Sequence, residues 1–308
     1  ILWSQNLERL AGERFGNAGA DDPLFFVHTF LWAFLPWSLL CLGALWAHGR
    51  RIARGGLRPQ AGVEALTLGT IVVLFAVISA SRFKLPHYLN ILLPLFAVLF
   101  AAWLAPRLAA PASRALRWTQ ALVCALLAAL AVALNGWAFP VDDWLAPVLA
   151  LAVALGGLVL ARAVRGGVRL VTVSVTAMAV FGVLLNFNFY PQLLRYQAGN
   201  RLADAAARLG LAPGSVSYLA GHARANSFDF GTAHLTPTLS LDALRAAPQA
   251  HVIYTEREGR HALEDAGFTV EVLASNPGFL VTRLNRRFLD PATRAVTLNE
   301  HFLLKVGE

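Results

Sequence analysis

The chain has 308 residues, of which 57% are hydrophobic and 14% are charged, and its formal net charge is +8. With a mean hydropathy of +0.55, this composition predicts a membrane protein with several spans. The positive charge does not indicate nucleic-acid binding, because the Arg residues cluster in short connections between apolar runs, as in cytoplasmic loops. Cys41 and Cys124 both lie inside apolar runs, so no disulfide framework is predicted.

Residues 1–22 form the first predicted segment, in which apolar residues recur every three to four positions among charged ones. This pattern is typical of a short amphipathic helix lying at a membrane interface. A helix that packs on protein instead would show the same pattern. Because the chain begins with Ile1 and its only methionine is Met178, we expect it to be the C-terminal part of a longer protein.

Residues 23–190 form the predicted membrane domain, an α-helical domain with about six transmembrane helices. Pro36 lies in the middle of the first apolar run and is expected to kink that helix. The six predicted spans are Leu24–Trp46, Val63–Ser79, Leu89–Leu104, Leu116–Trp137, Trp144–Ala161 and Leu170–Phe189.

Arginines in alternate connections set the predicted orientation. They follow the first, third and fifth spans, and this bias predicts that those three connections face the cytoplasm. The other connections and everything after Tyr190 then lie outside, in the periplasm if the membrane is a bacterial inner membrane. Arg50, Arg51, Arg54, Arg58, Arg107, Arg114, Arg117, Arg162, Arg165 and Arg169 are the basic residues of these three connections.

Residues 191–308 have the composition of a soluble domain, and they predict a small periplasmic α/β domain. A helix over Tyr190–Leu209 leaves the membrane, and Arg257–Ala266 is a second predicted helix, closed by Gly267. Four β-like runs accompany these helices, and a terminal hairpin is expected over Arg294–Leu298 and His301–Val306. The four runs are Ser215–Leu219, Ala250–Thr255, Phe268–Leu273 and Gly278–Leu284.

The connection Ser79–Pro94, called the junction below, holds the main candidate site. It places Arg82, Lys84, His87 and Tyr88 between two apolar runs, where charge is costly unless it is paired or hydrated. Two cations, an imidazole and a phenol suit the phosphate oxygens of an anionic lipid head group. The alternative is that the basic side chains only reach toward acidic lipids at the membrane surface.

Other polar motifs are weaker candidates. Asp142 and Asp143 are adjacent carboxylates, and we expect one of them to cap the helix that begins near Trp144. Asn226–Gly231 is interpreted as a buried turn rather than a binding loop. The histidines of the C-terminal domain show no metal-ligand spacing, and its glycines form no phosphate-cradling loop, so no metal site is predicted there.

A family resemblance rests on the junction motif. Ser81 to Pro94 resembles the Ser-x-x-Lys-x-x-x-Tyr…Pro signature of bacterial polyprenyl-phosphate-dependent glycosyltransferases. These integral membrane enzymes are related to protein O-mannosyltransferases and to the aminoarabinose transferase of lipid A. The similarity extends to Pro23–Trp46, Asn186–Pro191 and Phe288–Arg294, and so covers nearly the whole chain.

The resemblance implies transfer of a sugar from a polyprenyl-phosphate carrier to a glycolipid or protein acceptor, at the periplasmic face of the inner membrane. Lys84 and Tyr88 match the motif positions that hold the carrier phosphate, and Arg82 and His87 are their variable neighbours. The family's essential acidic residue lies in an N-terminal half, so no catalytic residue is assigned here. No cofactor is implied with certainty, and the requirement for a divalent metal stays open.

Two other classes of function remain open. A transporter or flippase of a lipid-linked saccharide would also need a site for an anionic head group. Such proteins usually carry charges near the middle of their spans, and these runs contain almost none. A membrane anchor whose outer domain recruits partners is the third alternative, and it leaves Lys84 without a role.

Overall fold

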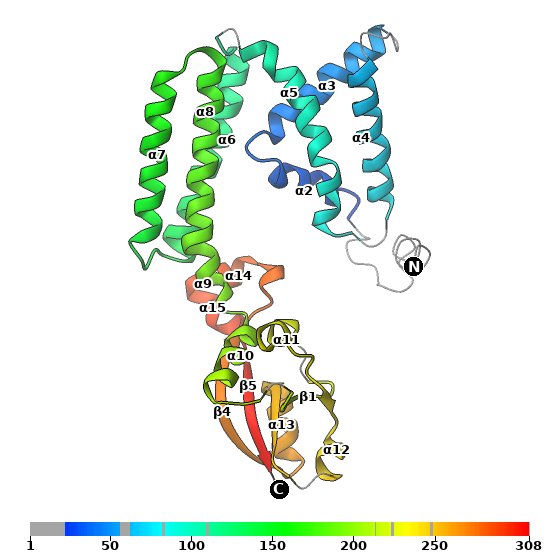
Figure 1. Ribbon diagram of the computed structural model, residues 1–308, viewed down its shortest axis with the longest axis vertical. Coiled ribbons are helices and arrows are strands. Elements are labelled where there is room, and N and C mark those ends of the chain that lie inside the picture. Colours follow the sequence, from blue (N-terminus) through cyan, green and yellow to red (C-terminus); the bar gives the residue numbers. More distant parts are fainter. Residues whose placement is uncertain are drawn as a thin grey trace. The chain divides into compact units, whose positions relative to one another are not determined.

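The computed structural model describes residues 22–55, 62–81, 84–108, 111–212, 214–222, 225–246 and 249–307. Within them the chain is helical up to residue 208 and mixes strands with short helices after it (Figure 1). The fold divides into two compact units, one of residues 1–129 and 149–182 and the other of residues 130–148 and 183–308. The predicted interfacial segment 1–22 lies outside the described residues, apart from Asp22.

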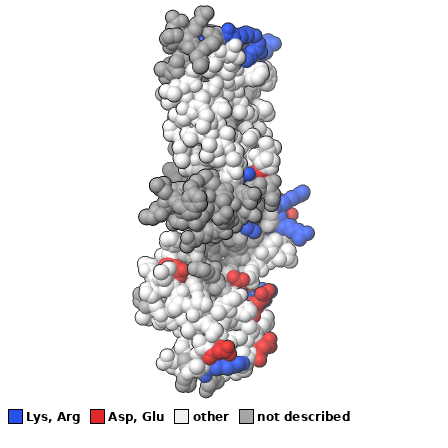
Figure 2. All heavy atoms as spheres, turned by 90° about the vertical axis from the view of Figure 1, so that its right-hand side faces the viewer, with Lys and Arg blue, Asp and Glu red and all other residues white. Residues whose placement is uncertain are grey.

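The first unit is a helical assembly with an aromatic core. Helices α2 to α5 pack on one another, and the rings of Phe30 and Phe96 lie with their centroids 4.6 Å apart. Figure 2 shows Lys and Arg side chains at the upper end of these helices, above a surface drawn white. The elements are α2 (Phe25–Ala33), α3 (Ser38–Gly55), α4 (Gly62–Ala80), the 3₁₀ helix η3 (Pro86–Ile91), α5 (Leu93–Leu108) and most of α6 (Arg114–Val132), α7 (Leu145–Ala163) and α8 (Gly166–Leu184).

The bend expected at Pro36 is confirmed, but Leu24–Trp46 is not one continuous kinked helix. This run forms two helices, α2 and α3, which are bent by 116° at the break between them. Pro36 lies in that break, and because proline has no N–H donor and its ring would crowd the preceding turn, it disfavours a continuous helix there. The Nε2 of Gln120 donates a hydrogen bond to Pro36 O at 3.1 Å, so a side chain of α6 stabilises the bend.

Three helices among the described residues are long and apolar enough to cross a membrane: Arg114–Ala138, Leu145–Ala163 and Gly166–Leu194. The bent pair α2 and α3 makes a fourth if it is counted as one span. Few residues of the three helices are buried, as expected of surfaces that face lipid. Ala65–Ala80 and Leu93–Leu108 are apolar but shorter, so the count of six spans remains a prediction.

The second unit begins with the ends of the long helices. A π-helical turn η4 (Ala133–Ala138) ends the first of them, and η5 (Leu185–Phe189) leads from α8 into α9 (Tyr190–Leu194). The helix expected over Tyr190–Leu209 is interrupted, because α10 (Ala198–Arg208) begins only after a turn. Tyr196 O accepts a hydrogen bond from Phe279 N at 2.8 Å, a tertiary contact that occupies this turn.

The C-terminal part is a mixed five-stranded sheet in the order β2-β1-β3-β5-β4. Strand β1 pairs in parallel with β2 and β3, whereas β5 is antiparallel to β3 and β4. Helix α10 packs with α11 beside the sheet, and α13 packs on β3, β4 and β5. The elements are β1 (Val216–Leu219), α11 (Asn226–Thr232), β2 (Thr238–Leu239), α12 (Leu241–Ala246), β3 (His251–Glu256), α13 (Arg257–Asp265), β4 (Thr269–Gly278) and β5 (Asn299–Gly307).

The α/β character of this domain is confirmed, but its last third is not as predicted. The run Gly278–Leu284 is no separate strand, because β4 extends to Gly278 and the 3₁₀ helix η6 (Val281–Arg283) follows it. The terminal hairpin is also wrong, since β5 inserts between β3 and β4. The segment before β5 forms α14 (Arg286–Leu289), α15 (Pro291–Arg294) and the 3₁₀ helix η7 (Ala295–Thr297).

An aromatic cluster joins this segment to the helix ends of the second unit. Phe288 is fully buried, with its ring centroid 6.2 Å from Phe139 and 5.1 Å from Tyr196. The guanidinium of Arg294 lies 4.1 Å from the Phe139 ring centroid and donates to the carbonyls of Ala138, Phe288 and Leu289. These contacts pack the β4–β5 connection (residues 279–298) directly on the end of the first long span.

Candidate functional site

The junction is held in place by its own apolar residues. Helix α4 ends at Ala80, the chain is extended at Leu85, and Pro86 occupies the first turn of η3, where its missing N–H costs nothing. Leu89 and Leu92 are almost fully buried in the aromatic core, and η3 contacts both α2 and α5. The part of the junction that carries His87 and Tyr88 is therefore packed on two helices, α2 and α5.

Lys84 is the most unusual residue of the junction, because its side chain is only 5% exposed. Its Nζ donates a hydrogen bond to the backbone oxygen of Asp22 at 2.9 Å. The Lys84 ammonium has three N–H donors, and within the described residues it makes only this hydrogen bond. A buried ammonium is costly unless its donors are used, so Lys84 has capacity for a further acceptor.

Asp22 and His28 complete a small polar group around Lys84. The carboxylate of Asp22 lies 2.7 Å from the Nε2 of His28, and it also accepts from Leu24 N at 2.9 Å. The hydrogen bond from His28 is the main cause that lowers the pKa of Asp22, and the nearby charges of His28 and Lys84 add to it.

His87 and Tyr88 form the second pair that the structure brings together. Their rings are 4.9 Å apart in an edge-to-face arrangement, with His87 exposed and Tyr88 half-buried against the aromatic core. Within the described residues, the Tyr88 hydroxyl makes no hydrogen bond. Arg82, the fourth predicted residue, lies outside the described residues.

Asp22 is the member of this group that the sequence does not indicate. It is 62 positions from Lys84, and a backbone carbonyl as an acceptor leaves no trace in a motif. A signal existed only for His28, a polar side chain at the start of an apolar run.

The adjacent carboxylates Asp142 and Asp143 have separate structural roles. Asp143 Oδ1 accepts from Leu145 N at 3.1 Å, which confirms the predicted cap at the start of α7. Asp142 forms an exposed ion pair with Arg195 at 3.4 Å. Neither contact is that of an acid/base pair converging on a substrate.

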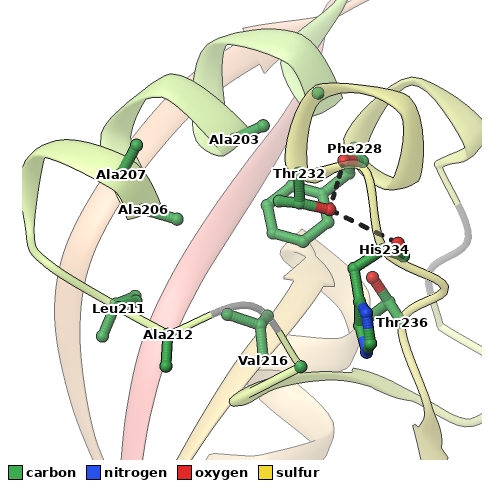
Figure 3. A pocket seen from close by; sticks show the side chains of 12 residues that line it. Ala203, Ala206, Ala207, Leu211, Ala212, Val216, Phe228, Thr232, His234 and Thr236 are labelled. Atoms are coloured by element: carbon green, nitrogen blue, oxygen red, sulfur yellow. Dashed lines mark hydrogen bonds between the residues drawn. The ribbon is translucent and has the colours of Figure 1, made fainter.

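The C-terminal domain contains a cavity of about 150 Å³ beside α10, α11 and β1. Figure 3 shows its lining, in which alanines and other apolar side chains predominate. The Thr232 hydroxyl on its wall donates to Phe228 O at 3.0 Å and so is satisfied within its own helix. None of its lining residues is Lys or Arg, so it offers a phosphate no permanent positive charge. Asn226–Gly231, expected as a turn, forms most of helix α11 on this wall.

A buried pair, Tyr254 and His301, lies in the sheet with 2.9 Å between the hydroxyl and Nδ1. Burial lowers the pKa of His301 to about 4 and raises the pKa of Tyr254, so both groups are neutral at pH 7. Within the described ranges, no group of three or more His, Cys, Asp or Glu side chains is arranged to hold a metal ion.

Comparison with known proteins gives a match at the level of the fold. No family model and no curated protein sequence matches the chain. The crystal structure of ArnT from Cupriavidus metallidurans bound to undecaprenyl phosphate is similar, with a TM-score of 0.62 and 16% identity over 98% of this chain and 54% of that one. Its apo state is similar with a TM-score of 0.58 and 17% identity over 92% of this chain and 52% of that one.

The chain therefore has the fold of about half of ArnT, and it spans about half the length of those structures. This confirms, for the fold, the resemblance that the junction motif indicated. Together with the long apolar helices, it indicates a membrane protein.

Proposed function

We propose that this chain is part of a membrane glycosyltransferase that takes a sugar from a polyprenyl-phosphate carrier, and that the junction binds the carrier phosphate. Lys84 and Tyr88 are the principal ligands, with Arg82 and His87 beside them. The observation that carries the proposal is the buried ammonium of Lys84, which uses one donor among the described residues. The likeness to a structure that holds undecaprenyl phosphate supports it.

The charge balance at Lys84 favours an anionic ligand. The Asp22 carboxylate is engaged by His28 and a backbone N–H, so Lys84 bonds only the carbonyl of that residue. A phosphate oxygen at the remaining donors would form charge-assisted hydrogen bonds, about twice as strong as neutral ones. The Tyr88 hydroxyl can donate a further bond from the same connection.

In the proposed reaction, these residues act on the leaving group. An acceptor attacks the anomeric carbon of the sugar, and the bond to the carrier phosphate breaks with negative charge growing on its oxygens. Lys84 stabilises that charge and accelerates the reaction to the extent that its bond strengthens toward the transition state. The base that activates the acceptor is not assigned to a residue of this chain.

The proposal includes a location and partners. The protein would cross a bacterial inner membrane six times, with the junction and the C-terminal domain on the periplasmic side. In this arrangement Lys84 lies at the level of the carrier head group. The acceptor is a glycolipid or a protein. The fold comparison favours this transferase over the transporter or flippase alternative.

The test is binding of undecaprenyl phosphate to the detergent-solubilised chain, wild type against Lys84→Met. We expect affinity to fall about 10- to 100-fold, because a hydrogen bond to a charged group contributes about 1.5–3 kcal/mol. Lys305 is the matched control, since the sequence contains two lysines and the second is exposed on β5. Lys305→Met should leave affinity unchanged.

A second variant separates binding from folding. Tyr88→Phe removes one hydroxyl that has no partner within the described residues, so it should preserve the fold and weaken binding several-fold. If Lys84→Met and Tyr88→Phe both bind the carrier as tightly as wild type, the junction is not its phosphate site. Lys84 would then serve only to hold Asp22.

A further inference from the structure

The β4–β5 connection lies on the ends of two long helices. Phe288 is buried against Phe139 and near Phe189, while Arg294 donates to the carbonyl of Ala138 at the end of the first helix. Phe279 stacks on Phe288 with 3.8 Å between ring centroids. The connection is thus fixed directly beyond the apolar parts of both spans.

Exposed aromatic residues mark the level of the membrane surface in the same unit. Trp137 and Trp144 flank the turn after η4, with Trp144 72% exposed, and Phe187 and Tyr190 lie exposed at the matching end of the other span. Exposed aromatic residues at the ends of spans are typical of the boundary between hydrocarbon and water. The connection packs against residues 138–139 and 189–196, which are close in sequence to these exposed aromatic residues.

The exposed residues of the connection include both basic and apolar side chains. Arg283, Arg286 and Arg287 are exposed, and in the described part of the chain their guanidinium groups make no ion pair or hydrogen bond. Leu280, Leu284 and Val296 are also exposed, Val296 to 84%. Asp290 is the one acid of this segment, and its carboxylate accepts from Ala292 N as a helix cap.

We propose that these exposed residues of the connection bind anionic phospholipid head groups and hold the C-terminal domain at the membrane surface. Guanidinium groups donate to phosphate oxygens, and basic residues beside a span are attracted to an anionic leaflet. The exposed leucines and valine can enter the boundary of the acyl chains, as in interfacial helices. This inference does not depend on a carrier site at the junction.

The test measures binding of the purified full chain, kept soluble in amphipol, to a vesicle membrane that contains phosphatidylglycerol. The triple variant R283Q/R286Q/R287Q should bind it about 100-fold more weakly, because each basic side chain at an anionic membrane surface contributes about fivefold. The control R201Q/R208Q/R245Q removes the same charge from exposed positions on α10 and α12, and its affinity should stay at the wild-type value.

Two further measurements define the ligand. R283K/R286K/R287K should restore most of the affinity, since attraction to a lipid surface needs charge rather than a guanidinium fork. Inorganic phosphate at the same concentration as the lipid should not displace the chain from the vesicles. Equal binding by the triple variant and its control would overturn the proposal. So would failure of the lysine variant to bind, or displacement by phosphate, because either result indicates a specific anion site.

Discussion

Lys84 and Arg294 are two cations held by backbone carbonyls, and they differ in how completely they are satisfied. Arg294, in the second unit, donates to three carbonyls and lies over the ring of Phe139. Lys84, in the first unit, is more deeply buried and donates to one carbonyl. Among the described residues, Arg294 thus uses three of its five donors and Lys84 uses one of its three.

This difference separates a structural cation from a candidate binding cation. A guanidinium that donates to several carbonyls and lies against aromatic rings stabilises the packing around it. An ammonium that is buried with donors to spare lowers stability unless something binds it, and such a cost is typical of functional sites.

The largest expected effect comes from removing the buried ring of Phe288, which lies near Arg294. Phe288→Ala should lower the free energy of unfolding of the second unit by about 3–5 kcal/mol, because it leaves a cavity among Phe139, Tyr196 and Phe279. Phe230→Ala is the control, since that ring is 86% exposed, and it should change stability by less than about 0.5 kcal/mol. Denaturant unfolding of both variants measures the contrast, and similar losses would contradict it.

Arg294→Met and Lys84→Met compare the two cations directly. Arg294→Met leaves three carbonyls without their donor and should cost about 2–4 kcal/mol of stability. Lys84→Met should cost less than about 1 kcal/mol, since the lost bond is offset by removal of a buried charge. In carrier binding, by contrast, Lys84→Met should lose more affinity than Arg294→Met. If Lys84→Met is the more destabilising of the two, Lys84 has the structural role.

Acid should lower the stability of the C-terminal sheet and of the junction in different pH ranges. Burial lowers the pKa of His301 to about 4, below its ordinary 6.5, so the unfolded chain takes up this proton first. The stability that neutral His301 contributes is complete above pH 6.5 and is lost as pH falls toward 4, by up to roughly 3 kcal/mol. The lowered pKa of Asp22 keeps its contribution at the junction until pH falls below the ordinary 3.8.

Hydrogen exchange, corrected for intrinsic rates, would follow both regions between pH 7 and 4.5. Protection should fall in β3 and β5 and persist in η3, and His301→Gln should flatten the pH dependence of the strands. Equal pH dependence in wild type and His301→Gln would assign the acid sensitivity to another group.

The smallest effects belong to the exposed carboxylates after the first long span. Asp142→Asn removes an ion pair with Arg195 that is about half exposed on both sides, and it should change stability by less than about 1 kcal/mol. Asp143→Ala removes a helix cap and should cost about 0.5–2 kcal/mol. Thermal unfolding of the two single variants tests this order, and a large effect of Asp142→Asn would reopen a functional role for it.

Helices and strands that depend on local pattern could be predicted from the sequence. The long apolar runs, α13 with its closing Gly267, and strands β1 and β3 all appear close to their predicted bounds. Asp143 could be predicted as a cap because a cap bonds its own next turn. The junction motif likewise indicated the fold that the ArnT structures share.

By itself, then, the sequence determined the class of protein, most helices and the residue types of the candidate site. Only the tertiary structure decided the 116° bend at Pro36, the place of β5 between β3 and β4, and the bond between Lys84 and Asp22. The physical reason is distance along the chain. Periodicity and capping report interactions within a few residues, whereas strand order and the partners of a buried charge depend on segments that meet only after folding.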